Sequence, residues 1–311
     1  MEAASTMGNH SFARVGLFSR TTLVGFAILA VAWLPVAMAG PPSAAAAGSK
    51  TAAQSISNVE YARPDGRPLL LDASIPRGQG PFPTAILVHG GYWVEGDKAT
   101  NLDPLKSLLS RAGYAWFSID YRLAPKYRYP AAIEDVETAV KWVRDHAEQY
   151  RVDSDRIALI GDGAGGYLVA MAGLDRQTAS GVAAVVDFEG PSDLTAFSDP
   201  TPPKGIGEFF GVTDLSDPSL KVLQDASPHN RVHKGMPPFL FIHGTTDQVV
   251  PFVSSPILCE AMRNVGAQCQ LLLVNDAEHG MENWEHKPGE EAWKSAMVAW
   301  LNTTLKAEPR A

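Results

Sequence analysis

The sequence predicts a mixed α/β fold with a mostly parallel central sheet that is flanked by helices. Apolar runs alternate with helical patterns along most of the chain, and this alternation is typical of parallel strands joined by crossovers. The apolar runs are also continuous, as expected for strands that are buried on both faces. With 311 residues, of which 45% are hydrophobic and 19% charged, the chain is long enough for one large core.

The N-terminal segment is predicted not to belong to the folded domain. Arg20 precedes an apolar run, "TTLVGFAILAVAWLPVAMA", and Ala37-Met38-Ala39 offers a small-x-small cleavage pattern, so residues 1–39 are predicted to be a secretory signal peptide. A membrane anchor is the alternative, because the run is nearly long enough to span a bilayer, but Pro35 favours cleavage. Residues 40–55 have the composition of a low-complexity linker. The mature protein is expected to be secreted or periplasmic, without stable membrane association.

Residues 56–308 are predicted to form the domain. Two strands surround an Asp-Gly turn and six further runs are strand-like, so the predicted strands are 58–64, 67–76, 84–91, 114–121, 156–162, 182–190, 239–247 and 269–276. A helix is expected to begin near Pro130, because the apolar residues Ile133, Val136 and Val140 recur at helical spacing. Further helices are expected after the strands that end at residues 162, 247 and 276.

A long segment between two predicted strands is expected to be a lid-like insertion after the sixth strand. Residues 191–238 are rich in proline, glycine, serine and aspartate, and loops of this length in compact domains are usually lids or binding loops. Open parallel sheets bind ligands at the carboxyl ends of their strands. The insertion is therefore expected to cover that edge of the sheet.

Four motifs that carry chemistry follow predicted strands. They are "HGGYW" at 89–93, "GDGAGG" at 161–166, Asp247 in "HGTTDQVVP" and His279 in "DAEHGM". Because the carboxyl ends of parallel strands meet at one edge, the four motifs are expected to lie together. Their chain order of turn, acid and histidine is that of hydrolases whose nucleophile stands in a G-x-S-x-G turn.

The turn at 161–166 lacks the expected nucleophile. The middle residue of a G-x-S-x-G turn is serine, and here it is Gly163. Asp162 is an alternative nucleophile, but it stands one residue out of register. Its side chain is therefore expected to point away from His279.

From about residue 60 to about residue 305 the chain resembles an α/β-hydrolase esterase of the hormone-sensitive-lipase-like type, in particular the bacterial acetylxylan/feruloyl esterase-like (BD-FAE-like) group. The motifs "HGGYW", "DYRLAP", "YPAAIEDVETAVKWV", "GDGAGG" and "HGTTDQVVP" carry the resemblance. It implies the α/β-hydrolase fold and hydrolysis of carboxylic esters by a Ser-Asp-His triad, with no cofactor and no metal.

Carried over residue by residue, the resemblance implies that Asp247 is the acid and His279 the base. The oxyanion hole would be the backbone N–H of Gly90 or Gly91 together with that of Ala164, the residue after the nucleophile position. Where the family pattern is "GDSAGG", this sequence departs from it at the serine. The resemblance therefore implies an esterase scaffold in a catalytically impaired chain.

Three side chains near the motifs are candidate substrate contacts. Tyr92 and Trp93 are expected to wall the acyl or alcohol pocket, and Glu189 closes a strand near the site, where it either contacts substrate or has a structural role. The expected partner is a small-molecule or carbohydrate-linked ester. The formal net charge of −8 argues against nucleic acid and anionic membranes, because both select basic surfaces.

The two cysteines are predicted to form a disulfide. Cys259 lies in a helical pattern and Cys269 begins the next strand, and such a pair is expected to oxidise in an exported protein. Two buried free thiols are the alternative, since spacing does not supply the Cα geometry. Two cysteines without a nearby histidine pair do not make a zinc site.

Three functions stay open at this point. The first is a secreted ester hydrolase of acetyl, feruloyl or short-acyl type whose serine is replaced by Gly163. The second is a natural pseudo-enzyme that binds an ester or glycan ligand without turnover. The third is an enzyme that activates water directly with His279 as the base. "HGGYW" also resembles formamidases of the same fold, so an arylformamidase-like amide hydrolase is a further alternative.

Overall fold

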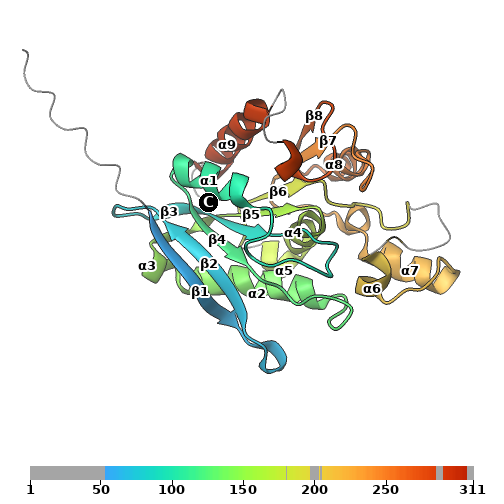
Figure 1. Cartoon of the computed structure of the whole chain (residues 1–311). Helices are drawn as coiled ribbons and strands as arrows, with labels where there is room; N and C mark the ends of the chain where they lie inside the picture. The colour runs from blue at the N-terminus through green and yellow to red at the C-terminus, as the bar shows by residue number, and fades with distance from the viewer. Residues whose placement is uncertain (1–52, 180, 197–202, 204, 285–289, 307–311) are drawn as a thin grey trace, which may run out of the picture. The chain divides into compact units, whose positions relative to one another are not determined.

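The computed structural model describes residues 53–179, 181–196, 203, 205–284 and 290–306 (Figure 1). The predicted signal peptide and nearly all of the predicted linker lie outside these residues. The first strand begins at Gln54, two residues before the predicted start of the domain. Within the described ranges, every helix is too short or too polar to cross a membrane.

The described part of the chain contains an eight-stranded sheet, in the order β1-β2-β4-β3-β5-β6-β7-β8 (Figure 1). β2 pairs antiparallel with both of its neighbours, β1 and β4. All other neighbouring strands in the sheet pair parallel. The predicted α/β fold with a mostly parallel sheet is confirmed. The strands are β1 (Gln54–Ala62), β2 (Leu69–Ile75), β3 (Phe82–Val88), β4 (Ala115–Ile119), β5 (Val152–Asp162), β6 (Ala184–Phe188), β7 (Phe239–Gly244) and β8 (Cys269–Val274).

Helices cover both faces of the sheet. On one face lie α1 (Asp103–Ala112) and α9 (Glu290–Lys306), and on the other lie α2 (Ala131–Asp145), α4 (Ala164–Leu174) and α8 (Ser254–Asn264). Short helices complete the described chain: η1 (Pro64–Gly66), α3 (Ala147–Tyr150), α5 (Arg176–Ala179), α6 (Ile206–Phe210), α7 (Asp217–Ala226), η2 (Pro228–Arg231) and η3 (Met281–Trp284).

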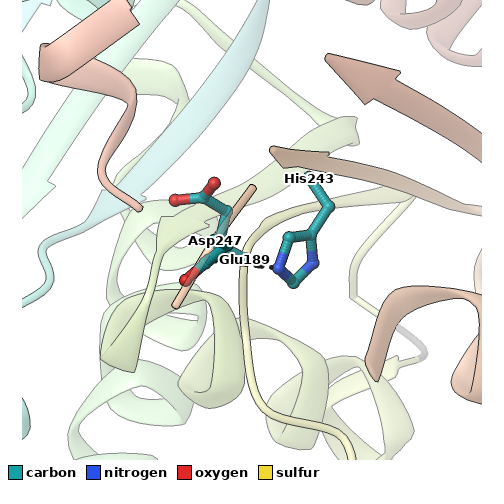
Figure 2. A group of neighbouring side chains, drawn as sticks. All are labelled: Glu189, His243 and Asp247. Atoms are coloured by element: carbon teal, nitrogen blue, oxygen red, sulfur yellow. Dashed lines mark ion pairs between the residues drawn. The ribbon is translucent and has the colours of Figure 1, made fainter. Parts of the chain in front are cut away.

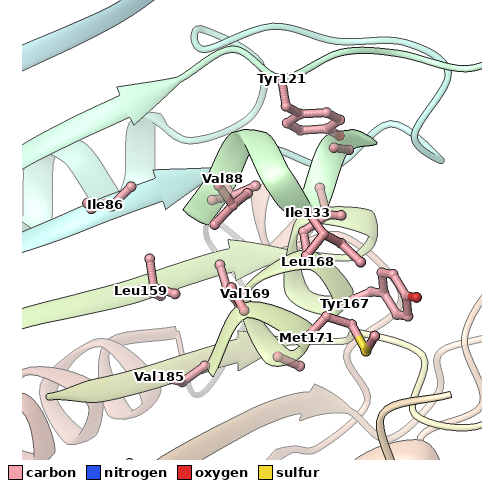
Figure 3. Close-up of a cluster of buried hydrophobic side chains, with 14 of the residues drawn as sticks. Ile86, Val88, Tyr121, Ile133, Leu159, Tyr167, Leu168, Val169, Met171 and Val185 are labelled. Carbon is pink, nitrogen blue, oxygen red and sulfur yellow. The ribbon is translucent and has the colours of Figure 1, made fainter. Parts of the chain in front are cut away.

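Successive residues of β3 point into different cores, as the pleat of a strand requires. Ile86 and Val88 belong to the core beneath α2 and α4, where they meet residues of β5 and β6 (Figure 3). Ala85 and Leu87 belong to the core beneath α1 and α9. This burial on both faces is the physical reason why the strand is apolar without interruption.

Small residues bring the start of α4 against the sheet. A Cβ atom on Gly165 would lie 2.1 Å from the carbonyl oxygen of Val88, and one on Gly161 would lie 2.2 Å from the carbonyl oxygen of Gly165. Only glycine allows so close an approach of two backbones. The approach places the N-terminus of α4 at the carboxyl ends of β3 and β5.

The segment between β6 and β7 contains α6, α7 and η2. Its helix α6 packs on aromatic residues from elsewhere in the chain: Phe209 stacks on Trp93 with ring centroids 5.0 Å apart, and Phe210 meets Trp93 edge to face at 5.8 Å. The described part of the predicted insertion therefore contacts the loop after β3. Closer to the C-terminus, Cys259 in α8 and Cys269 in β8 form a disulfide, with their Cα atoms 5.6 Å apart.

Candidate active site

The acid and the base proposed from the sequence are hydrogen-bonded to each other. Asp247 follows β7 and His279 follows β8, and Nδ1–H of His279 donates to Oδ2 of Asp247 over 2.7 Å. The other carboxylate oxygen of Asp247 accepts the backbone N–H groups of Val249 and Val250 at 2.8 and 2.9 Å. These bonds orient the carboxylate and define the tautomer of the histidine.

The charges of the pair reinforce each other. Burial opposes ionisation of Asp247, but hydrogen bonds from His243 and His279 outweigh it and hold the pKa of Asp247 well below its usual range. Burial also opposes protonation of His279, but its hydrogen bond to Asp247 and the nearby Glu189 raise the pKa of His279 to about 9. The fold therefore favours an imidazolium beside a carboxylate.

Gly163 occupies a sharp turn between β5 and α4. Its φ and ψ angles are 53° and −110°, a region that favours glycine and strains other residues. A Cβ atom on Gly163 would lie 3.3 Å from Nε2 and 3.6 Å from Cε1 of His279, with no other contact within 4 Å in the described structure. A side chain at this position would therefore point at the free nitrogen of the base.

The start of α4 and the loop after β3 lie beside Gly163, because Ala164 and Gly91 line the same cavity as Gly163. Ala164 is the first residue of α4, so its N–H has no partner within the helix. The loop after β3 turns sharply at Gly91, whose φ is 105° and whose carbonyl oxygen accepts the N–H groups of Val94 and Glu95. A Cβ atom on Gly91 would lie 2.1 Å from the carbonyl oxygen of Glu95, so only glycine fits this turn.

A cavity of about 170 Å³ joins these groups. The predicted site residues Gly90, Gly91, Tyr92, Trp93, Gly163, Ala164 and His279 all line it, together with Pro203 and Ile206 of the insertion and Val249 and Val250 beside the acid. Tyr92 is 38% exposed and lies at the surface, whereas Trp93 is 4% exposed. The indole N–H of Trp93 donates to the carbonyl oxygen of Ala164 over 3.1 Å, which ties the loop after β3 to α4.

The BD-FAE family profile matches residues 71–262, more than half of the chain. This chain belongs to the BD-FAE family of carboxylic ester hydrolases. The matched range contains Gly91, Gly163 and Asp247 and ends before His279, which the structure places beside them.

Two curated relatives are esterases from Mycobacterium tuberculosis. Esterase LipC is 37% identical over 216 residues, which are 65% of this chain and 54% of the relative, and the probable carboxylic ester hydrolase LipM is 31% identical over 201 residues, which are 61% and 47%. The chain thus spans about half the length of the curated relatives it matches. Among solved structures, a truncated carbohydrate esterase from gut microbiota has a TM-score of 0.73 at 26% identity, over 82% of this chain and 98% of that chain.

Of the two roles left open for Glu189, its contacts favour the structural one. Its side chain is fully buried, and the lining of the cavity does not include it. One carboxylate oxygen accepts the N–H of Gly244 at 3.1 Å and the other accepts the N–H of Gly280 at 2.6 Å. Glu189 therefore lies outside the lining of the cavity, with its oxygens held by backbone N–H groups.

Asp162 lies on the wall of the cavity of this BD-FAE protein, although its register suggested a side chain that points away from the base. One oxygen lies 3.2 Å from the place where a Cβ atom on Gly90 would be, and the other has no hydrogen-bond partner in the described chain. Burial and the nearby Glu282 raise the pKa of Asp162 to about 7. Its carboxylate accepts the backbone N–H of Met281, so its position favours support of the backbone after His279 over attack on a substrate.

A serine and a second histidine lie behind the acid, and the sequence pattern did not reveal them. The hydroxyl of Ser255 donates to Nδ1 of His243 over 2.8 Å, and Nε2 of His243 lies 3.2 Å from Oδ2 of Asp247. The groups follow the order of a Ser-His-Asp triad. Ser255 is only 1% exposed and His243 is fully buried, so neither reaches an external ester, and the pair instead orients Asp247.

Glu189, His243 and Asp247 form a buried cluster (Figure 2). One ligand-type atom from each lies within 4.8 Å of the others, which is a spacing that a metal ion could use. The atoms are already engaged: Glu189 accepts two backbone N–H groups, and Nε2–H of His243 is shared between the carbonyl oxygen of Val250, at 3.0 Å, and Oδ2 of Asp247, at 3.2 Å. Because hydrogen bonds already occupy these side-chain atoms, the cluster is a buried hydrogen-bond network.

Proposed function

We propose that this BD-FAE family member is a secreted ester hydrolase of short-acyl type whose nucleophile position carries glycine, so that the chain hydrolyses esters very slowly. One observation carries the proposal. A side chain at Gly163 would point at Nε2 of His279 with no other contact within 4 Å in the described structure. The acid, the base and the backbone donors stand around that space, and the nucleophilic hydroxyl is the missing group.

The mechanism of a serine form follows from these positions. His279 would take the proton of the serine hydroxyl through Nε2, while Asp247 stabilises the imidazolium. The N–H groups of Gly91 and Ala164 would donate to the oxygen that becomes negative in the tetrahedral intermediate. The same histidine would then return the proton to the leaving alcohol.

With Gly163, only water can attack. His279 can take a proton from a water molecule, but no covalent bond holds that water in line, and no acyl-enzyme can form. Loss of a triad serine costs on the order of 10⁶ in kcat, while an oxyanion hole and binding alone retain roughly 10³–10⁴ over the uncatalysed rate. The chain is therefore expected to bind esters and to turn them over at a rate that ordinary assays barely detect.

The shape of the cavity supports a small acyl group. The cavity measures about 170 Å³, and much of its wall consists of Trp93, Ile206, Val249 and Val250. Such a wall suits an acetyl or another short acyl chain, with few polar groups to recognise it. A solved structural relative is a carbohydrate esterase, which supports a carbohydrate-linked alcohol on the other side of the ester.

Export is the part of the proposal that rests on the N-terminal sequence and the cysteines. The run that ends at Ala39 has a signal-peptide pattern, and the Cys259–Cys269 disulfide suits an oxidising compartment. N-terminal sequencing of exported protein should find a first residue near Gly40. An intact Met1 on exported protein would contradict this part of the proposal.

The deciding experiment compares Gly163→Ser with Gly163→Ala and the parent chain, using p-nitrophenyl acetate. Alanine is the matched control, because it places the same Cβ in the same strained turn without a hydroxyl. Gly163→Ser should exceed both in kcat by roughly 10³ or more, and it should show a burst of product and ping-pong kinetics. If Gly163→Ser folds but is no faster than Gly163→Ala, the function is instead ligand binding without turnover, for which the intact cavity suffices.

A further inference from the structure

The base of the site faces two carboxylates from two adjacent strands. Nδ1 of His279 lies 2.7 Å from Oδ2 of Asp247, which follows β7, and 3.4 Å from Oε2 of Glu189, which follows β6. Both carboxylate side chains are fully buried. Nδ1–H of His279 therefore has Asp247 as its near acceptor, and the carboxylate of Glu189 already lies beside it as a more distant one.

Glu189 also joins the loops that carry the acid and the base. It accepts the N–H of Gly244, three residues before Asp247, and the N–H of Gly280, the residue after His279. The backbone at Glu189 has a φ of 56°, a left-handed conformation that strains a residue other than glycine. The strain at Glu189 is therefore offset by the hydrogen bonds that both of its carboxylate oxygens accept.

The electrostatics set an order between the two carboxylates. Burial raises the pKa of Glu189 to about 8; His279 lowers it, while Asp162 and Asp247 raise it. Glu189 is therefore the weaker acid as long as Asp247 is ionised. Removal of the charge on Asp247 removes one cause of the raised pKa, so Glu189 then ionises more readily beside the histidine.

We propose that Glu189 is a positioning residue that holds the acid and base loops together and becomes the partner of His279 Nδ1–H when Asp247 cannot accept it. The role of His279 in hydrolysis rests on the function proposed above. The contacts of Glu189 do not depend on it, so the two ideas can fail separately.

The first test follows His279 itself, in the full chain with Gly163. The side-chain resonances of His279, assigned by their loss in His279→Gln, are titrated by ¹H–¹⁵N NMR in Glu189→Gln, Asp247→Asn and the double variant. Each single substitution should lower the pKa of His279, and the double variant should lower it further than Asp247→Asn does, by about one pKa unit, which is tenfold in proton affinity.

The matched control is Asp187→Asn. Asp187 is a buried carboxylate of β6, two residues before Glu189, and its Oδ1 accepts the N–H of Gly190. It is not among the groups that shift the pKa of His279, whereas Asp247, Glu189 and Asp162 are. The control should leave the titration of His279 unchanged. If Glu189→Gln behaves like this control, both alone and together with Asp247→Asn, the proposal is wrong.

The second test uses activity in the Gly163→Ser background. Asp247→Asn should retain measurable hydrolysis of p-nitrophenyl acetate. Glu189→Gln should then lower kcat about tenfold more in the Asp247→Asn variant than in the chain with Asp247, with little change in KM. Glu189→Asp keeps the charge and serves if Glu189→Gln does not fold: it should preserve part of the His279 pKa shift. If Gly163→Ser is inactive, the proposed function fails, and the NMR titration still decides the role of Glu189.

Discussion

The two sides of the candidate site are built in different ways. On one side, Gly91, Gly163 and Ala164 define the site through backbone conformation, without a polar side chain. On the other side, Asp247 and His279 are held by side-chain hydrogen bonds that link the loops after β6, β7 and β8. If Gly163 replaces a serine, as proposed above, the difference explains how the surroundings stay intact: glycine adopts the turn at least as easily as serine.

The largest expected effect sharpens this contrast. In the Gly163→Ser background, His279→Ala should lower kcat by roughly 10³–10⁶, because serine then has no base. In the chain with Gly163, the same substitution should change the already slow hydrolysis far less. Steady-state kinetics with p-nitrophenyl acetate measure both. A large loss in the Gly163 chain would mean that water activation by His279 is efficient without serine.

The pH profile of activity tests the side of the site that is built from the side chains of Asp247, Glu189 and His279. A base must be neutral to take a proton, and Asp247 together with Glu189 raises the pKa of His279 to about 9. In Gly163→Ser, kcat/KM should therefore rise with pH through about 9, far above the 6.5 of an ordinary histidine. Asp247→Asn should move this rise to lower pH. A rise centred near the ordinary value would show that the carboxylates do not hold the charge of His279.

The raised pKa of His279 also affects stability, and here the effect falls as the pH rises, whereas the activity is expected to increase. The folded pKa of His279 is raised above its ordinary value of 6.5 to about 9, so the protonated form stabilises the fold. This contribution is fully present below pH 6.5 and is lost as the pH rises through about 9. Urea unfolding at a series of pH values should show the loss, and His279→Gln should remove it.

The disulfide is expected to stabilise only the side of the site that carries Asp247 and His279. Cys259 and Cys269 tie α8, which follows the loop of Asp247, to β8, which leads to His279, and they are 10 residues apart in sequence. Replacing both by alanine should cost about 2–3 kcal/mol of unfolding free energy, from the entropy of a loop of this length. Urea denaturation gives the value. Thiol labelling of both cysteines in denatured, unreduced parent protein would show instead that the bond does not form.

The smallest expected effect tests the backbone side. Gly163→Ala should destabilise the protein by about 1–2 kcal/mol, because φ is 53° and the added Cβ would meet His279 at 3.3 Å. Gly113→Ala is the control: its φ is 82°, and nothing lies within 4 Å of the added Cβ. The excess cost at Gly163 over Gly113 measures how closely the base approaches the empty position. An equal cost would mean that His279 yields freely.

Much of the fold could be predicted from local patterns. All eight predicted strands are present, because continuous apolar runs such as Ile157–Ile160 reflect burial on both faces of the sheet. The helix expected near Pro130 begins at Ala131. Helix α1 was missed, although Pro104 at its start, Gly113 at its end and the buried Leu105 and Leu109 carry the usual signals.

The candidate site divides in the same way. Gly163, Asp247 and His279 were found because each stands in a recognisable motif after a strand, and the structure brings them together. Nothing local marks Ser255 as a partner of His243, 12 residues before it, or Glu189 as an acceptor for Gly280, 91 residues after it. The role of Glu189 stayed open for this reason, since a strand-end position alone does not show which way a side chain points.

The sequence by itself determined the strands, the order of the motifs and the glycine at position 163, where a G-x-S-x-G turn has serine, because all of these depend on neighbours along the chain. Only the tertiary structure decided which carboxylates His279 faces. That depends on β6 lying beside β7 and β7 beside β8, which brings Glu189 and Asp247 to the same nitrogen. Such pairings arise from contacts between distant segments, and the burial of both carboxylates then sets their pKa values and the charge of the base.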